Sequence, residues 1–146
     1  MKISIGCDHG GFALKQSIVS SLSKRGIELI DYGTYNTQSV DYPLYAKKVC
    51  SDVQRKRSHF GVLICTTGVG MSIAANKQKG IRAALVHSID IAKMSRLHNN
   101  CNVICLGANY TSEEDAAEWV YQFINSKFEG GRHIRRIDQL EEEGSC

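Results

Sequence analysis

Short apolar runs alternate along the chain with longer segments of helical periodicity. Five runs rich in β-branched residues each lead into a turn rich in Gly, Asp or Asn, and an amphipathic segment follows. This rhythm is typical of repeated strand–helix units. The runs are nearly all continuous rather than alternating in polarity, as expected of strands covered on both faces in a parallel sheet. The predicted strands cover residues 2–7, 27–32, 61–65, 82–87 and 102–106, and the predicted helices cover residues 11–24, 43–56, 70–77, 89–97, 112–127 and 131–142.

The order of these elements predicts an α/β fold. We expect a Rossmann-like three-layer αβα sandwich, with a five-stranded parallel sheet and an additional C-terminal helix. The 146 residues suffice for one domain, covering residues 1–146, that buries its core without disulfides or a structural metal. Open sheets of this kind bind ligands where loops leave the carboxyl ends of the strands, so the candidate chemistry is expected there.

Composition and charge exclude several classes of function. Hydrophobic residues make up 42% of the chain and charged residues 23%, as in ordinary globular proteins. The net charge of +3 comes from 18 basic and 15 acidic residues that are spread along the sequence. Because no basic face with interleaved aromatics appears, we expect no nucleic-acid partner. No apolar run reaches membrane-spanning length and the N-terminus has no signal-peptide core, so we expect no membrane association.

Cysteine usage bears on metal binding and on the cellular compartment. No pair has the C-x-x-C spacing of a zinc site, so no metal site is expected. Free thiols are typical of a reducing environment, which predicts a cytoplasmic location. The six cysteines are Cys7, Cys50, Cys65, Cys101, Cys105 and Cys146.

The most distinctive motif, C-T-T-G-V-G, begins at Cys65 and follows the third predicted strand. A glycine-rich turn that opens a helix presents backbone N–H groups to an anion. A dinucleotide fingerprint fails here because Ile73 replaces the required small residue, and a Cys-x5-Arg phosphatase loop fails because Met71 replaces arginine. Two interpretations remain. Cys65 is either a base beside an anion hole, with its thiolate favoured by the helix terminus, or a cysteine that only packs at a strand end.

The first strand ends in Asp8 and His9, followed by two glycines that let a ligand approach the backbone. A carboxylate and an imidazole at this edge are candidates for ligand binding. The alternative is structural, with Asp8 capping a helix and His9 lying on the surface.

Two further groups of polar residues lie late in the chain. His98 and Asn99 follow the fourth predicted helix, where asparagine is a common C-cap but histidine is also the usual acid or base at neutral pH. Arg132 and Arg136 are four residues apart and therefore share a helix face, which suits a phosphate. The alternative for these arginines is a solvated face paired with the glutamates at 141–143.

Six motifs in one order strengthen the functional interpretations. They are G-C-D-H-x-G-F, D-Y-P, C-x-T-G-V-G-x-S-I-A-A-N-K, G-I-R-A, R-x-H-N and E-G-G-R-H-x-x-R. Together they closely resemble ribose-5-phosphate isomerase type B, from Lys2 to about Ile137. The wider family includes galactose-6-phosphate isomerase subunits and enzymes that act on allose 6-phosphate.

The resemblance implies an aldose–ketose isomerase of the pentose phosphate pathway that needs no cofactor. Cys65 would remove the C2 proton of open-chain ribose 5-phosphate and return it to C1 through a cis-enediolate, giving ribulose 5-phosphate. The backbone of Thr66, Thr67, Gly68, Val69 and Gly70 would form the anion hole, and the Thr67 hydroxyl would help handle the sugar oxygens.

The resemblance also assigns the remaining site residues. His98 would be the acid that opens the furanose ring, Asp8 would hold hydroxyls, and Asn99 would contact the enediolate. The phosphate would be bound by His9, Arg132 and Arg136. Two positions depart from the family pattern: Thr66 stands where many relatives have glycine, and Asn109, among the substrate contacts, stands where several have arginine.

Relatives of this kind are homodimers, sometimes paired into tetramers, and the resemblance implies that His98 and Asn99 enter the partner's active site. Two alternatives remain for the function. One keeps the chemistry but takes a six-carbon substrate, allose 6-phosphate or galactose 6-phosphate. The other is a non-catalytic module that binds a sugar phosphate, because a fold does not fix a function.

Overall fold

A five-stranded sheet forms the middle layer of the molecule in the computed structural model, which describes residues 1–141. All neighbouring strands are parallel, in the order β2-β1-β3-β5-β4. This arrangement confirms the predicted α/β fold with its parallel sheet. The strands are β1 (Lys2–Cys7), β2 (Glu28–Asp31), β3 (Phe60–Cys65), β4 (Ala83–Leu85) and β5 (Val103–Gly107).

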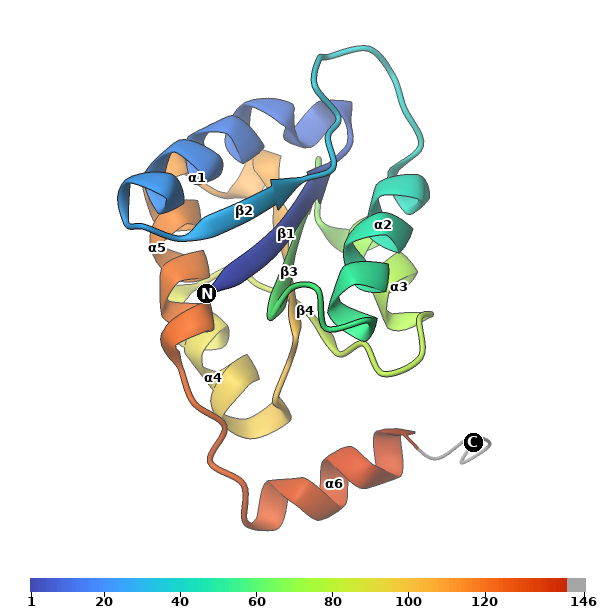
Figure 1. Cartoon of the computed structure of the whole chain (residues 1–146), viewed down its shortest axis with the longest axis vertical. Coiled ribbons are helices and arrows are strands. Elements are labelled where there is room, and N and C mark those ends of the chain that lie inside the picture. Colours follow the sequence, from blue (N-terminus) through green and yellow to red (C-terminus); the bar gives the residue numbers. More distant parts are fainter. Residues whose placement is uncertain (142–146) are drawn as a thin grey trace.

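Helices cover both faces of the sheet and complete the three layers (Figure 1). One face is covered by α1 (Phe12–Lys24), α4 (Ile89–Asn99) and α5 (Glu113–Asn125), and the other by α2 (Tyr42–Gln54) and α3 (Val69–Asn76). Two short 3-10 helices, η1 (His9–Gly11) and η2 (Ala108–Tyr110), follow β1 and β5. The last helix, α6 (Arg132–Glu141), extends away from the layers at the lower end of the molecule in Figure 1.

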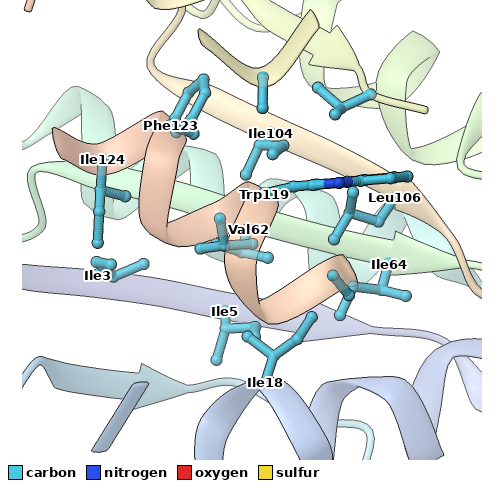
Figure 2. Close-up of a cluster of buried hydrophobic side chains, with 14 of the residues drawn as sticks. Ile3, Ile5, Ile18, Val62, Ile64, Ile104, Leu106, Trp119, Phe123 and Ile124 are labelled. Atoms are coloured by element: carbon cyan, nitrogen blue, oxygen red, sulfur yellow. The ribbon is translucent and has the colours of Figure 1, made fainter. Parts of the chain in front are cut away.

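The alternation of side chains along the central strands divides the core in two. Val62 and Ile104 belong to one buried cluster with Ile18 of α1 and Trp119 of α5, which Figure 2 shows. The intervening residues of the strands face the opposite way, toward α2 and α3. Cys65 belongs to this second cluster, so its position in β3 directs its side chain toward the α2–α3 layer.

Most element ends lie within two or three residues of the prediction, and two differences are informative. The fourth strand is shorter than predicted: β4 lies at an edge of the sheet and pairs only with β5, over three residues. The fourth helix is longer and includes His98 and Asn99, while Asn100 adopts the left-handed conformation of a C-cap with φ of 46°. The capping asparagine is therefore Asn100, which leaves Asn99 on the helix. Among the described residues, no helix combines the length and apolar character needed to cross a bilayer.

Candidate active site

The tip of β3 brings a thiol and a helix N-terminus together. The backbone N–H of Gly68 donates to Sγ of Cys65 across 3.2 Å, and α3 begins at the next residue. Gly68 has φ of 77°, a conformation that glycine adopts without steric penalty, and the turn thereby directs this amide back at the sulfur. An N–H donor and the positive end of a helix both stabilise negative charge placed beside them. The loop therefore has the features of a base beside an anion hole.

The neighbouring loops are tied to the Cys65 loop by backbone hydrogen bonds. The N–H of Asn109 donates to the carbonyl of Thr66 at 3.1 Å, and the N–H of Asp8 donates to the carbonyl of Ile64 at 3.2 Å. On the β5 side, a methyl group added to Gly107 would lie 2.6 Å from the backbone oxygen of Thr67. Three strand ends are therefore packed too closely to shift independently.

Polar side chains at this edge are held by hydrogen bonds to the backbone. Asp8 is buried, and its Oδ1 accepts from the N–H of Gly11 at 3.1 Å, so the capping interpretation holds for that oxygen. Nδ1 of His9 accepts from the backbone N–H of Val40 at 3.2 Å, which orients the ring. Oγ1 of Thr67 accepts from the N–H of Val69 at 3.3 Å. These contacts fix the side chains around the thiol.

Other cysteines differ from Cys65 in surroundings. Burial raises the pKa of Cys7 to about 12, an effect that the positive charge of Lys15 partly opposes. Burial likewise raises the pKa of Cys50 to about 12 and that of Cys101 to about 11. Cys7 and Cys50 are completely inaccessible, whereas Cys65, at the carboxyl end of β3, is 5% exposed and Cys101, after α4, is 6% exposed. The raised pKa values keep Cys7, Cys50 and Cys101 in the unreactive thiol form.

The remaining predicted site residues lie at the opposite edge of the sheet. Helix α4 starts near the carboxyl edge and runs back for 11 residues, about 16 Å, so His98 and Asn99 in its last turn lie near the amino edge. Arg132 and Arg136 belong to α6, beyond the same end (Figure 1). One chain therefore brings together Cys65 with Asp8, His9, Thr66, Thr67, Gly68, Val69, Gly70 and Asn109, but it does not bring His98, Asn99, Arg132 or Arg136 to them.

A cluster at the amino edge contains the residue types of a metal site. His98, Glu129 and His133 have ligand atoms within 4.8 Å of one another. However, the two imidazole rings are stacked, with centroids 4.5 Å apart and planes inclined by 14°. A metal ion lies in the plane of each imidazole that binds it, and two nearly parallel planes do not meet at one ion. The rings would have to rotate before they could chelate a metal.

Three residues of this architecture carried no role in the sequence prediction. His133 and Glu129 belong to the E-G-G-R-H motif, and the spacing of four between them was the available signal of proximity. Tyr42, in the D-Y-P motif, lies so close to the loop after β3 that a methyl group on Gly70 would be 2.7 Å from its ring. This contact joins residues that are distant in sequence, so the sequence pattern alone could not predict it.

Comparisons with known proteins agree with the fold and the motif order. The profile of the Ribose/Galactose Isomerase family matches residues 3–140. Ribose-5-phosphate isomerase B of Escherichia coli is 45% identical over 139 residues, which cover 95% of this chain and 93% of that protein.

Two solved structures are similar over nearly the whole chain. The ribose 5-phosphate isomerase of Thermotoga maritima has a TM-score of 0.94 and 46% identity, covering 96% of this chain and 97% of that one. The Mycoplasma genitalium ribose-5-phosphate isomerase B with bound ribulose-5-phosphate has a TM-score of 0.91 and 40% identity, covering 96% and 93%. With a family profile and full-length relatives in agreement, this chain belongs to the ribose/galactose isomerase family.

Proposed function

We propose that this protein interconverts ribose 5-phosphate and ribulose 5-phosphate by moving a proton between C2 and C1. The observation that carries the proposal is the thiol of Cys65 within a glycine-rich loop whose amide N–H of Gly68 lies 3.2 Å from the sulfur. Relatives with 45% and 46% identity that act as ribose-5-phosphate isomerases support the choice of substrate.

The proposed proton transfer uses only groups of the chain. The thiolate of Cys65 removes the C2 proton of the open-chain aldose, and the electron pair moves to form an enediolate with negative charge on O1. Backbone N–H groups of the loop and the N-terminus of α3 stabilise that charge. The thiol then returns a proton to C1 while O1 gains a proton and O2 loses one, with the hydroxyl of Thr67 assisting. The product is the ketose.

Complete sites, in this proposal, require two chains in a homodimer. Ring opening needs an acid and the phosphate needs cations, yet His98 and Arg132 lie at the opposite edge of the sheet from Cys65. A partner in a two-fold dimer contributes its own His98, Asn99, Arg132 and Arg136 to the Cys65 edge of the first chain. In such a symmetric interface each chain gives to the other what it receives, so two equivalent sites form.

An apolar surface beside β4 is suited to receive the second copy. Leu85, Ile91 and Met94 are each at least 37% exposed. They line a groove of about 390 Å³ together with Leu140 of α6, whose side chain is also exposed. The groove lies beside α4, which carries His98, so burial of this surface would place the proposed acid at the interface.

Mixed dimers test the sharing of sites. Cys65→Ala and His98→Asn chains, co-expressed with different tags, give a mixed dimer with one site that retains both groups. We expect this dimer to recover about half of the wild-type turnover of ribose 5-phosphate, because one of two sites is intact. The two parent homodimers, assayed at equal protein concentration, are the controls. A mixed dimer no more active than the better parent would exclude shared sites.

Proton exchange distinguishes the isomerase from a module that only binds. Protein treated with a chelator should release tritium from C2 of labelled ribose 5-phosphate into water, since the thiol exchanges its proton with solvent during turnover. Calorimetric binding of the sugar phosphate without any tritium release would favour the non-catalytic alternative instead.

The five-carbon substrate is favoured over a six-carbon one by the position of Thr66. A methyl group added to Gly10 would lie 2.2 Å from Oγ1 of Thr66, so this side chain fills the space between the loops after β1 and β3. A longer sugar has less room at this edge. The ratio of kcat/KM for ribose 5-phosphate to that for allose 6-phosphate should fall in Thr66→Gly, and an unchanged ratio would remove Thr66 from substrate selection.

We also propose a cytoplasmic location. Five cysteines in the described part of the chain are unpaired and buried, which suits a reducing compartment. Fractionation of cells that express the protein at its natural level would test this.

A further inference from the structure

His98 is part of a compact cluster whose other two members, Glu129 and His133, have no role in the proposed reaction so far. Its ring stacks on that of His133, with centroids 4.5 Å apart and an interplanar angle of 14°. Oε2 of Glu129 lies 3.7 Å from Nε2 of His98 and 3.7 Å from Nε2 of His133. One carboxylate oxygen is therefore within ion-pair distance of two stacked imidazoles.

The backbone holds this cluster in place. The N–H of Glu129 donates to the carbonyl of Leu97 at 3.0 Å, which attaches the segment before α6 to the last turn of α4. Gly130 and Gly131 then adopt φ of 68° and 58°, and these left-handed conformations turn the chain into α6. The turn returns His133 onto His98.

The two imidazoles have unequal access to water. The side chain of His133 is 10% exposed, whereas that of His98 is 40% exposed. His133 thus forms the covered side of the stack, and His98 presents its ring to solvent or to a bound molecule.

Electrostatics favour one proton for the pair. Burial lowers the pKa of His133, and positive charge on His98 of α4 and on Arg132 and Arg136 of α6 lowers it further, while Glu129 opposes the shift. Two stacked imidazolium ions would repel each other, and the buried ring has the greater desolvation penalty. The covered ring of His133 therefore resists protonation.

We propose that His133 and Glu129 are positioning residues that hold the His98 ring in place during ring opening; this inference rests on the proposed function. In that step the C1–O4 bond of the furanose breaks and its electron pair goes to O4, which takes the proton of His98. The O1 hydroxyl loses its proton to solvent as the C1 carbonyl forms, and His98 is reprotonated from solvent.

Glu129→Gln and His133→Phe test the inference, because the first keeps the shape and removes the charge and the second keeps a stacked ring without nitrogen. We expect each to lower kcat/KM for ribose 5-phosphate about 10- to 100-fold, as loss of orientation does. Exchange of the C1 proton of ribulose 5-phosphate with deuterated water should change less than about threefold, because that exchange needs Cys65 but no ring. Glu28→Gln and His59→Phe, at exposed positions outside the cluster, are matched controls.

A pH profile separates positioning from packing. Without the carboxylate a protonated stack is less favourable, so the basic limb of kcat/KM for ribose 5-phosphate should move to lower pH in Glu129→Gln. Equal losses in conversion and in exchange, or no loss in either variant, would overturn the inference. If His133→Phe does not fold, Glu129→Gln alone still decides. Wild-type protein that performs neither reaction would instead contradict the proposed function.

Discussion

The two edges of the sheet are built in different ways. At the carboxyl edge, Cys65, Asp8 and Thr66 are fixed by backbone hydrogen bonds between loops and by glycines that allow close contact. At the amino edge, one backbone hydrogen bond attaches Glu129 to Leu97, and the His98 ring itself is held only by side chains, through stacking on His133 and the nearby carboxylate of Glu129. Backbone packing tolerates little displacement, whereas exposed side chains remain available to another molecule. The proposed base thus belongs to the rigid edge and the proposed acid to the edge that a partner can reach.

The anchoring of α4 shows how the amino edge achieves order without a packed loop. Nε of Arg82 donates to the carbonyl of Asn99 at 3.1 Å, and another guanidinium nitrogen donates to the carbonyl of Asn100 at 2.9 Å. The same guanidinium pairs with Glu141 of α6. One arginine therefore joins the helix that carries His98 to the helix that carries the phosphate-binding candidates.

Removing the thiol of Cys65 should reduce activity more than any other change. A small reduction would contradict the placement of the base at the carboxyl edge. Cys65→Ala is expected to lower kcat for ribose 5-phosphate by a factor of about 10² to 10⁴, because a general base is lost while binding groups remain. Calorimetry should show nearly unchanged substrate affinity. Cys50→Ala, which deletes a buried thiol from the same core cluster, is the matched control and should retain activity. Near wild-type turnover in Cys65→Ala would remove this residue from the mechanism.

Alanine substitutions of glycine should lower the free energy of unfolding more at the carboxyl edge than at the amino edge, which is the second-largest effect that we expect. A methyl group on Gly11 would lie 2.8 Å from both the backbone oxygen and Cγ2 of Ile64, so we expect Gly11→Ala to lower the free energy of unfolding by about 2–4 kcal/mol. A methyl group on Gly131 would meet no atom within 4 Å, and only its φ of 58° disfavours alanine, by about 1–2 kcal/mol. Urea midpoints at one protein concentration measure both. Equal losses of unfolding free energy in the two variants would show that both edges tolerate an added methyl group equally well.

The smallest expected effect concerns the response of stability to pH. Because the folded state lowers the pKa of His133 from its ordinary value of 6.5, the unfolded chain binds more protons below that pH. Stability should therefore fall as the pH drops below about 6.5, and His133→Phe should remove this part of the slope. Urea midpoints at pH 7.5 and pH 5.5 measure it, with His59→Phe as the control. A His133→Phe slope as steep as that of the wild type would contradict the assignment.

Much of the fold and half of the candidate site could be predicted from the sequence. Continuous apolar runs predicted the strands correctly because burial on both faces leaves a local signature in composition. The loop after β3 was also visible, since glycines, a cysteine and a helix start follow one another within six residues. His98, Arg132 and Arg136 were also candidates from their local patterns, and the resemblance assigned their roles and placed His98 in the partner's site. Neither the patterns nor the resemblance gave the contacts that hold these side chains.

Burial of single polar groups had no local signature. Lys15 is completely inaccessible, and its Nζ lies 2.5 Å from Oδ2 of Asp31, at the end of β2. In the sequence Lys15 looks like any solvated helix residue, because its partner comes from another strand. Similarly, the sequence of α6 did not predict that the ring of His133 would stack on that of His98.

The sequence by itself determined the order of strands and helices and the chemistry of each loop, because both depend on neighbouring residues. Only the tertiary structure decided that Cys65 and His98 lie at opposite edges of one chain, and that Glu129 and His133 accompany the latter. Helices that return antiparallel to the strands place residues close in sequence at opposite ends of the molecule. That separation is a property of packing, and it makes a second chain part of the proposed site.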